Sequence, residues 1–138
     1  MGKKLVMDSA SLVSVLMNCF NGEKYLREAI DSIINQTYKN WELVFWDNQS
    51  TDKSKAIFDS YQDERLKYYY APEHTDLGGG RANAFKYLYG DYIAVLDVDD
   101  IWLPTKLKKQ LQLFTDPDVG IVISNTLFSN ETDERILY

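Results

Sequence analysis

The sequence has few of the residues that disulfides, zinc sites and nucleophilic active sites require. It contains one cysteine, Cys19, and one histidine, His74, in 138 residues. A single cysteine excludes an internal disulfide, which suits a reducing cytoplasm. One cysteine and one histidine are also too few for a Cys/His zinc site, and they form no evident nucleophile–base pair. We therefore expect a small buried thiol at Cys19 and a surface imidazole at His74.

Long hydrophobic runs and basic runs are also missing. No apolar stretch approaches the roughly 18 residues of a membrane-spanning helix, and the first residues lack the apolar region of a signal peptide. The chain has 15 basic and 21 acidic residues, a net charge of −6, with no Lys/Arg run. This charge does not favour nucleic acid as a partner. We expect a cytoplasmic protein, either free or peripheral at the inner face of the membrane. An acidic protein of this kind needs a metal cation to bind an anionic substrate.

Hydrophobic runs alternate with apolar stripes of helical spacing along the chain. Strands are expected at 12–17, 41–46, 66–71, 92–96 and 120–124, and helices lie between them in the pattern. This order predicts an α/β fold, a doubly wound and mostly parallel sheet with helices on both faces. No repeat or linker divides the chain, so we expect one domain over residues 1–138 with its core at about 12–124.

The expected strand at 92–96 runs directly into three carboxylates. Asp97, Asp99 and Asp100 follow an apolar run that reads as a strand buried on both faces. Like charges this close repel each other unless a cation or hydrogen-bond donors hold them. A D-x-D loop offers the hard oxygen ligands that Mg²⁺ or Mn²⁺ prefers. The alternative is a solvated turn whose aspartates cap the next helix.

Two other expected strands also end in polar residues. Asn18 follows the first strand and Asp47 follows the second. The carboxyl ends of parallel strands meet at one edge of a sheet, so both should converge with the acidic cluster, where Asp47 can accept a hydrogen bond from a base. Between the third and fourth strands, Gly78-Gly79-Gly80 predicts a loop, followed by a helix from about Arg81 to Tyr89. Arg81 is either solvent-facing or neutralised by a phosphate or carboxylate.

Five stretches in this order resemble the nucleotide-sugar-binding half of family 2 glycosyltransferases, which are inverting enzymes with the Rossmann-like GT-A fold. The stretches begin at Val13, Ser32, Trp46, Leu77 and Gly90, and the resemblance spans about Leu12 to Ser124. It implies a nucleotide-sugar donor, most often a UDP-sugar, and Mn²⁺ or Mg²⁺ as cofactor. It also implies an acceptor such as a glycan or lipid-linked sugar, which the sequence does not identify.

The resemblance assigns roles by position. Asp47 is similar to the acid that hydrogen-bonds the base, and Arg81 to an arginine near the base and diphosphate. The other matched positions are the base and ribose pocket (Asn18, Phe20 and Asn21) and the D-x-D-D motif (Asp97, Asp99 and Asp100), in which Asp99 approaches the ribose or metal and Asp100 the metal and diphosphate.

Two departures from the family pattern affect these expectations. Asn48 replaces a carboxylate of the usual Asp-Asp-Gly-Ser, and Ala82 replaces the asparagine of the usual Ala-Arg-Asn. The resemblance implies that these 138 residues lack the acceptor-binding half, which supplies the general base in the family, and the acids near the end of the chain match no base motif (Asp116, Asp118, Glu131, Asp133 and Glu134). We nominate no general base. A donor-binding module without transfer activity is therefore a second hypothesis, and the exposed surface left by the missing half predicts self-association.

Two other enzyme classes fit less well. A haloacid-dehalogenase-like phosphohydrolase also has an apolar strand followed by D-x-D, but on the first strand, whereas here the motif follows the fourth. A dinucleotide-binding domain needs a glycine-rich turn after the first strand, where residues 18–22 contain one glycine, Gly22.

Overall fold

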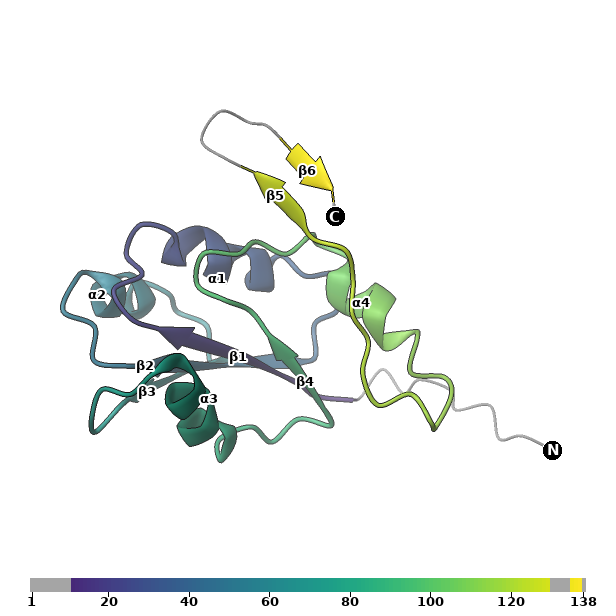
Figure 1. Ribbon diagram of the computed structural model, residues 1–138, viewed down its shortest axis with the longest axis horizontal. Coiled ribbons are helices and arrows are strands. Elements are labelled where there is room, and N and C mark those ends of the chain that lie inside the picture. Colours follow the sequence, from purple (N-terminus) through teal and green to yellow (C-terminus); the bar gives the residue numbers. More distant parts are fainter. Residues whose placement is uncertain (1–10, 130–134, 138) are drawn as a thin grey trace.

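Four parallel strands form the sheet on which the protein is built, in a computed structural model that describes residues 11–129 and 135–137. In chain order they are β1 (Val13–Cys19), β2 (Trp41–Asp47), β3 (Leu66–Tyr70) and β4 (Tyr92–Val95). Across the sheet the order is β3-β2-β1-β4, and every neighbouring pair is parallel (Figure 1). The first four predicted strands are therefore confirmed.

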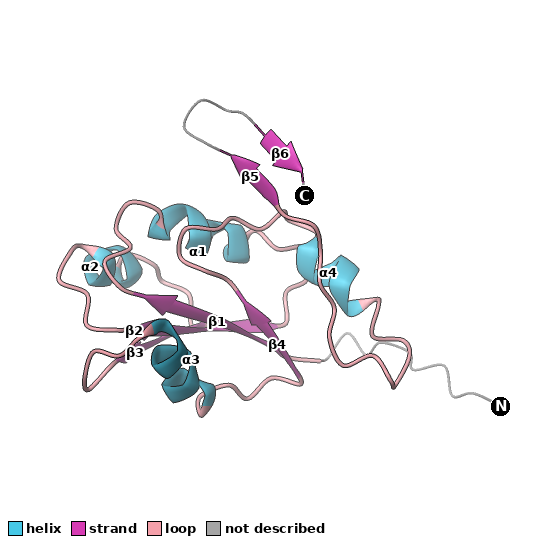
Figure 2. Cartoon of the chain, viewed as in Figure 1, coloured by secondary structure: helices cyan, strands magenta, loops and turns pink. Residues whose placement is uncertain are grey.

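Helices cover both faces of this sheet, as the alternating pattern predicted (Figure 2). One face carries α1 (Leu26–Ile34), α2 (Ser54–Asp59) and α4 (Lys106–Leu111), while α3 (Leu77–Phe85) lies on the other. The larger core forms on the face of the sheet covered by α1, α2 and α4. The smaller core, beneath α3, consists of Leu16, Val44, Trp46, Ala71 and Ala84. Because β1 and β2 supply side chains to both cores, they are buried almost throughout.

The first two helices begin later than the polar residues before them suggest. Asn21, Ser50 and Thr51 are of types that cap helices, but neither helix begins directly after them. The first helix, α1, begins after Tyr25, and α2 begins after Lys53. Asp52 Oδ1 accepts a hydrogen bond from the N–H of Ser54, the first residue of α2, at 2.9 Å.

The strand before the acidic cluster is not buried on both faces, contrary to the prediction. In β4 exposed and half-buried residues alternate, and 44% of Ile93 and 49% of Val95 are exposed. This strand is at the edge of the sheet, beside β1 alone. An edge strand has a neighbour on one side only, so an apolar run does not by itself indicate full burial.

The glycine run lies within α3 and not in the predicted loop. The helix starts at Leu77 and ends at Phe85, earlier than the predicted range of 81–89. Asp76 is the N-cap, and its Oδ1 accepts a hydrogen bond from the Gly79 N–H at 2.6 Å. Glycine is a poor helix former, which led the prediction to a loop, but the aspartate cap starts the helix here.

The predicted fifth strand at 120–124 has no regular secondary structure. Ile121 and Ile123 are 83% and 87% exposed. A strand requires a hydrogen-bonding neighbour, and within the described residues nothing pairs with this segment. An apolar run without a neighbouring strand therefore forms no strand, and its large side chains stay exposed.

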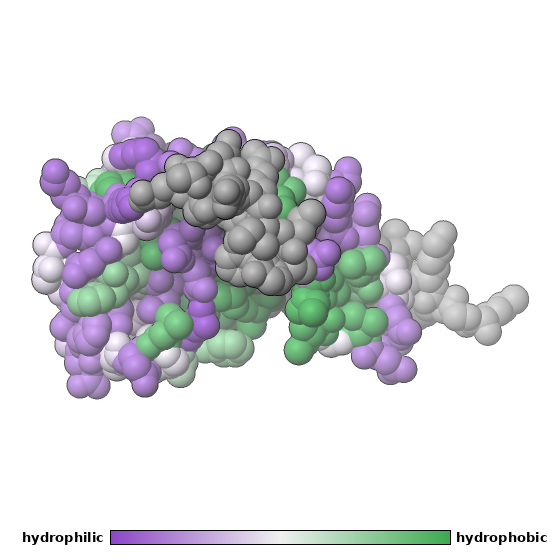
Figure 3. Space-filling view, turned by 45° about the horizontal axis from the view of Figure 1, so that its top comes forward, coloured by the Kyte–Doolittle hydropathy of each residue, from purple (hydrophilic) through white to green (hydrophobic). Residues whose placement is uncertain are grey.

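A two-stranded antiparallel sheet follows, formed by β5 (Leu127–Ser129) and β6 (Arg135–Leu137). Three acids considered in the sequence, Glu131, Asp133 and Glu134, lie outside the described residues. Figure 3 shows hydrophobic residues exposed among polar ones on one face of the molecule. In the described part of the chain, no helix has the length and apolarity to span a membrane.

Candidate functional site

A cleft lies at the carboxyl-terminal edge of the sheet, where the sequence predicted convergence. Its volume is about 460 Å³, within the usual range for small-molecule sites. The strand ends and the segment that leads into α3 supply its lining, which consists of Asn18, Phe20, Asn48, His74, Thr75, Asp76, Leu77, Asp97, Val98 and Asp99. Four residues predicted to bind donor are among these, namely Asn18, Phe20, Asp97 and Asp99.

Asn18 lies at the end of β1 against the first turns of α3. A Cβ at Gly80 would come within 2.5 Å of Asn18 Oδ1, so this position of α3 must be glycine for the asparagine to keep its place. Asn18 Oδ1 is buried and accepts no hydrogen bond from the described residues. Buried polar atoms nearly always have a partner. The cleft wall thus includes an acceptor that the fold itself does not use.

Asp47 does not line the cleft, so the structure does not support its predicted contact with the base. Only 1% of the residue is exposed, and both carboxylate oxygens are occupied. Oδ1 accepts the Ser50 N–H at 2.7 Å, and Oδ2 accepts the Tyr68 hydroxyl at 2.5 Å. This carboxylate holds the turn after β2 and joins it to β3. Sequence position alone did not distinguish a buried turn-forming acid from one that faces a ligand.

Asn48, the residue noted as a departure from the family pattern, takes the place in the cleft lining that was predicted for Asp47. Its side-chain amide bonds Thr75 in both directions. Nδ2 donates to the Thr75 carbonyl at 2.6 Å, and Oδ1 accepts the Thr75 N–H at 3.1 Å. An aspartate has no N–H to donate, so only an amide makes this pair of bonds. Asn48 therefore fixes the segment that leads into α3.

The same segment carries His74, which the sequence analysis left as a surface imidazole. The rings of His74 and Phe20 are tilted by 57° with centroids 4.4 Å apart, and both rings line the cleft. The Nδ1 of His74 lies 2.9 Å from the Asn48 carbonyl oxygen. The available sequence signal was weak, since His74 is simply the one histidine, two residues before the Asp76 cap.

Asn21 also lies outside the cleft, contrary to the prediction. It is exposed, has a φ of 52°, and its Oδ1 accepts the Thr51 N–H at 2.8 Å. In return, the Asn21 N–H donates to Ser50 Oγ at 3.0 Å. Left-handed backbone is tolerated by asparagine better than by most residues. Asn21 therefore links the turns after β1 and β2 and is not part of the cleft lining.

Arg81 forms an ion pair with Asp97. The sequence had allowed either a phosphate or a carboxylate to neutralise Arg81, and here it is a carboxylate. The contact joins α3 to the end of β4. It fixes the first acid of the D-x-D sequence at the cleft wall. Arg81 Nε is buried and donates to none of the described residues. The Nε–H of Arg81 is thus a hydrogen-bond donor without an acceptor among the described residues.

Asp99 lines the cleft, whereas Asp100 lies beside it. Partial burial raises the pKa of Asp100, and the charges of Asp99 and Asp97 raise it further. A nearby cation stabilises the charged form of a carboxylate whose ionisation its surroundings disfavour. Among residues 11–129 and 135–137, however, no three Asp, Glu, His or Cys side chains lie close enough to hold a metal ion. The protein offers one or two carboxylates here and not a complete coordination shell.

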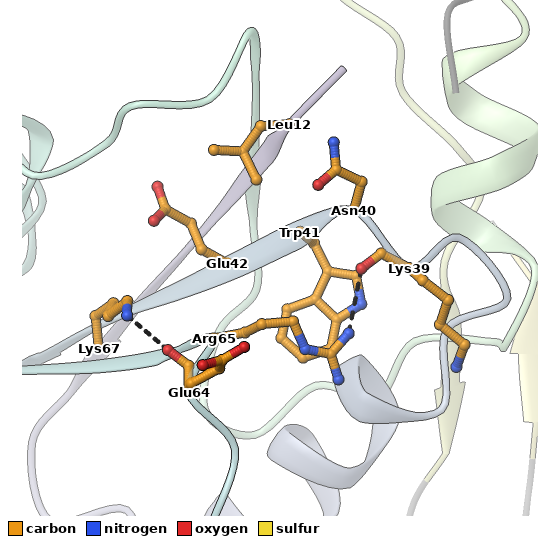
Figure 4. A pocket seen from close by; sticks show the side chains of 8 residues that line it. All are labelled: Leu12, Lys39, Asn40, Trp41, Glu42, Glu64, Arg65 and Lys67. Atoms are coloured by element: carbon orange, nitrogen blue, oxygen red, sulfur yellow. Dashed lines mark hydrogen bonds between the residues drawn. The ribbon is translucent and has the colours of Figure 1, made fainter. Parts of the chain in front are cut away.

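A second pocket lies at the opposite edge of the sheet, near the amino ends of the strands (Figure 4). Its lining residues are Leu12, Lys39, Asn40, Trp41, Glu42, Glu64, Arg65 and Lys67. The Arg65 guanidinium lies 3.7 Å from the centroid of the Trp41 ring and pairs with Asp63 at 2.6 Å. Lys67 Nζ donates to the Glu64 carbonyl at 2.6 Å. Of these two cations, Arg65 is paired with a carboxylate, whereas Lys67 bonds a neutral carbonyl.

The sequence and the fold have counterparts among known proteins. A sequence model described as Glycosyl transferase family 2 matches residues 14–137. UDP-Glc:alpha-D-GlcNAc-diphosphoundecaprenol beta-1,3-glucosyltransferase WfgD of Escherichia coli is 34% identical over 114 residues, which are 83% of this chain and 45% of that protein. Glycosyltransferase GlyG of Streptococcus pneumoniae is 33% identical over 135 residues, which are 94% of this chain and 44% of GlyG. The chain thus spans less than half the length of these relatives.

Solved structures show the same architecture. S. aureus TarS, residues 1–349, in complex with UDP-GlcNAc is 27% identical with a TM-score of 0.70, and the match covers 74% of this chain and 30% of that one. The mannosyltransferase PcManGT of Pyrobaculum calidifontis, in complex with GDP-Man and Mn²⁺, has a TM-score of 0.73 at 23% identity over 78% of this chain and 33% of that one, a likeness of fold. The parallel sheet with its two layers of helices is therefore of the GT-A type, and the chain belongs to glycosyl transferase family 2.

Proposed function

We propose that this chain is the donor-binding part of an inverting glycosyltransferase that uses a UDP-sugar to glycosylate an acceptor hydroxyl, as in polysaccharide or glycoconjugate synthesis. The observation that carries the proposal is the cleft itself, which brings Asn18 and Phe20 together with Asp97 and Asp99 at one sheet edge. The likeness to TarS, whose structures were solved with UDP and UDP-GlcNAc, supports a uridine nucleotide. In this proposal the donor-binding domain has its core at residues 12–124.

The base and ribose would lie against the β1 side of the cleft. Phe20 is 49% exposed at the cleft, and an exposed aromatic face suits stacking with a base. Asn18 lines the cleft, and its buried Oδ1 accepts no hydrogen bond from the described residues. Asp97, held by Arg81, presents its carboxylate at the opposite side, where a ribose hydroxyl can donate to it. Together these contacts would orient the nucleotide with its diphosphate toward Asp99.

A divalent cation, Mg²⁺ or Mn²⁺, fits the acidic side of the cleft. Asp99 and Asp100 would hold it, and diphosphate oxygens would complete its coordination, as is usual for Mg²⁺ held by one or two carboxylates. When bound, the ion offsets negative charge that develops on the leaving diphosphate. The raised pKa of Asp100, caused by burial and by the neighbouring carboxylates, supports a site that a cation stabilises.

No residue of this chain is proposed as general base. In the described part of the chain, the cleft lining contains three acids, which are the cap residue Asp76 and the donor-side residues Asp97 and Asp99. The chain also spans less than half of its relatives. These observations favour, as a second candidate, donor binding without transfer by this chain alone.

Calorimetric titration with UDP, in the presence and absence of Mn²⁺, tests donor binding. We expect binding that requires Mn²⁺ and is weakened at least tenfold in Asp99→Ala and in Asp100→Ala. Asp116→Ala is the matched control, because Asp116 is an exposed acid outside the cleft. Binding that is equal with and without the metal and in all variants would contradict the metal-bridged site. Release of UDP from UDP-GlcNAc by the chain alone would contradict the second candidate.

A further inference from the structure

The segment between β3 and α3 forms a wall of the cleft that the proposed roles leave unassigned. Residues His74, Thr75, Asp76 and Leu77 of this segment all line the cleft. The His74 ring packs against Phe20, with ring centroids 4.4 Å apart, and both rings are exposed at the cleft. Two adjacent exposed rings give a planar base an apolar surface to contact.

The hydrogen bond of His74 determines which of its ring nitrogens faces a ligand as an acceptor. Nδ1 lies 2.9 Å from the carbonyl oxygen of Asn48, and a carbonyl oxygen can only accept. Nδ1 must therefore carry the hydrogen. In the neutral imidazole, Nε2 is then the acceptor. Among the described residues no group donates to Nε2, which leaves its lone pair available to a ligand.

Asn48 holds this histidine in place through its main chain and its side chain. The main-chain carbonyl accepts from His74, while the side-chain amide makes its two bonds with the backbone of Thr75, the next residue. Asn48 is only 2% exposed, so these bonds are shielded from water. With the bond from Thr75 Oγ1 to Asn48 Oδ1, four hydrogen bonds join this short segment to one buried residue and keep the His74 ring in a defined position.

We propose that His74 is a specificity-determining residue of the donor site and that Asn48 is its positioning residue. This role rests on the proposed nucleotide-sugar function. In the bound state, His74 Nε2 accepts a hydrogen bond from the ring N–H of the base. Uracil, thymine and guanine have such an N–H. Cytosine and adenine present an acceptor at the equivalent ring nitrogen, and two acceptors facing each other disfavour binding.

Titration of UDP and of CDP in the presence of Mn²⁺ tests this, because the two nucleotides differ only in the base. Wild-type protein should bind UDP more tightly than CDP. His74→Phe keeps a ring against Phe20 but has no acceptor, so the ratio of UDP to CDP affinity should fall roughly five- to tenfold. His74→Gln, whose amide oxygen can replace the acceptor, should retain part of the preference. Glu73→Gln, in the same segment but outside the lining, should leave the ratio unchanged.

Asn48→Asp tests the positioning role. The aspartate keeps an acceptor for the Thr75 N–H and loses the donor to the Thr75 carbonyl, so the ratio should fall while the requirement for Mn²⁺ remains. An unchanged ratio in His74→Phe would overturn the role of His74 and leave donor binding intact. Failure of the wild-type chain to bind either nucleotide would instead overturn the proposed function, and with it this inference.

Discussion

The Tyr68 hydroxyl donates a hydrogen bond to the buried carboxylate of Asp47 at 2.5 Å, and so joins β3 to the end of β2. The other oxygen of this carboxylate accepts the Ser50 N–H, which closes the turn after β2. Burial raises the pKa of Tyr68, and the hydrogen bond to Asp47 raises it further. The acid at the end of β2 is therefore structural, and its neighbour Asn48 faces the cleft.

Removal of this hydroxyl should destabilise the fold. Tyr68→Phe leaves the buried Asp47 carboxylate with one hydrogen bond fewer, and hydrogen bonds to charged groups contribute about 1.5–3 kcal/mol. Urea unfolding at pH 7 should show a loss of that size. Tyr61→Phe is the matched control, because Tyr61 is half-buried and its hydroxyl bonds Asp31 at 2.8 Å in contact with solvent, so its loss should cost less. Equal losses in the two variants would contradict a special role for the buried pair.

Stability should decline at alkaline pH in a way that Tyr61 partly controls. Burial, followed by the hydrogen bond and charge of Asp31, raises the pKa of Tyr61 from 10.0 to about 12. The folded state thus favours the neutral phenol, and its contribution is complete below pH 10 and is lost as pH rises from about 10 to 12. Urea unfolding at pH 9, 10 and 11 should show a steeper decline for wild type than for Tyr61→Phe. Parallel declines would exclude this contribution.

Much of the fold follows from the sequence because its signals are local. The apolar runs of β1 and β2 and the apolar stripe of α1 have the periods of buried strands and of a packed helix. Burial of β4 and pairing of residues 120–124 were predicted wrongly, since both depend on which strands are neighbours. The glycine run was placed in a loop from its composition, which does not show that the Asp76 side chain caps a helix there.

The sequence predicted that the strand ends converge at the sheet edge where the cleft lies. Asn18, Phe20, Asp97 and Asp99 line the cleft because parallel strands bring their carboxyl ends together. Asp47 and Asn48 are adjacent in sequence and point to different environments, one to the interior and one to the cleft. The resemblance assigned Asp47 to the base, and because period-two alternation does not continue through a turn, strand position did not show that Asn48 is the one that lines the cleft.

Two glycines of α3 should respond oppositely to alanine. A Cβ at Gly78 would meet Asp76 Oδ1 at 3.6 Å, an ordinary contact, so Gly78→Ala should stabilise the helix by about 0.5–1 kcal/mol. A Cβ at Gly80 would come 2.5 Å from Asn18 Oδ1 and push that side chain out of place. Because a side-chain end can move, Gly80→Ala should remain folded and bind UDP at least several-fold more weakly. Calorimetry and thermal unfolding of both variants check this, and unchanged UDP affinity in Gly80→Ala would contradict it.

The free edge of β4 should cause self-association of this chain. In the parallel pair with β1, alternate backbone groups of β4 face its partner, so the others face the open edge, where no described strand lies. Ile93 and Val95 add exposed apolar side chains at this edge. Such an edge is a template for pairing with a second copy. Light scattering over a concentration series should therefore show a mass that rises above 16.0 kDa.

A charged side chain within the edge strand should oppose this pairing. Val95→Lys should shift the mass toward the monomer, because lysines on edge strands block strand pairing. Ile121→Lys is the control, since Ile121 is more exposed than Val95 but lies outside any strand, so it should leave the association unchanged. If both variants reduced association equally, general hydrophobic contact would explain it and not the β4 edge. A monomeric mass for the wild-type chain at the highest concentration would refute self-association altogether.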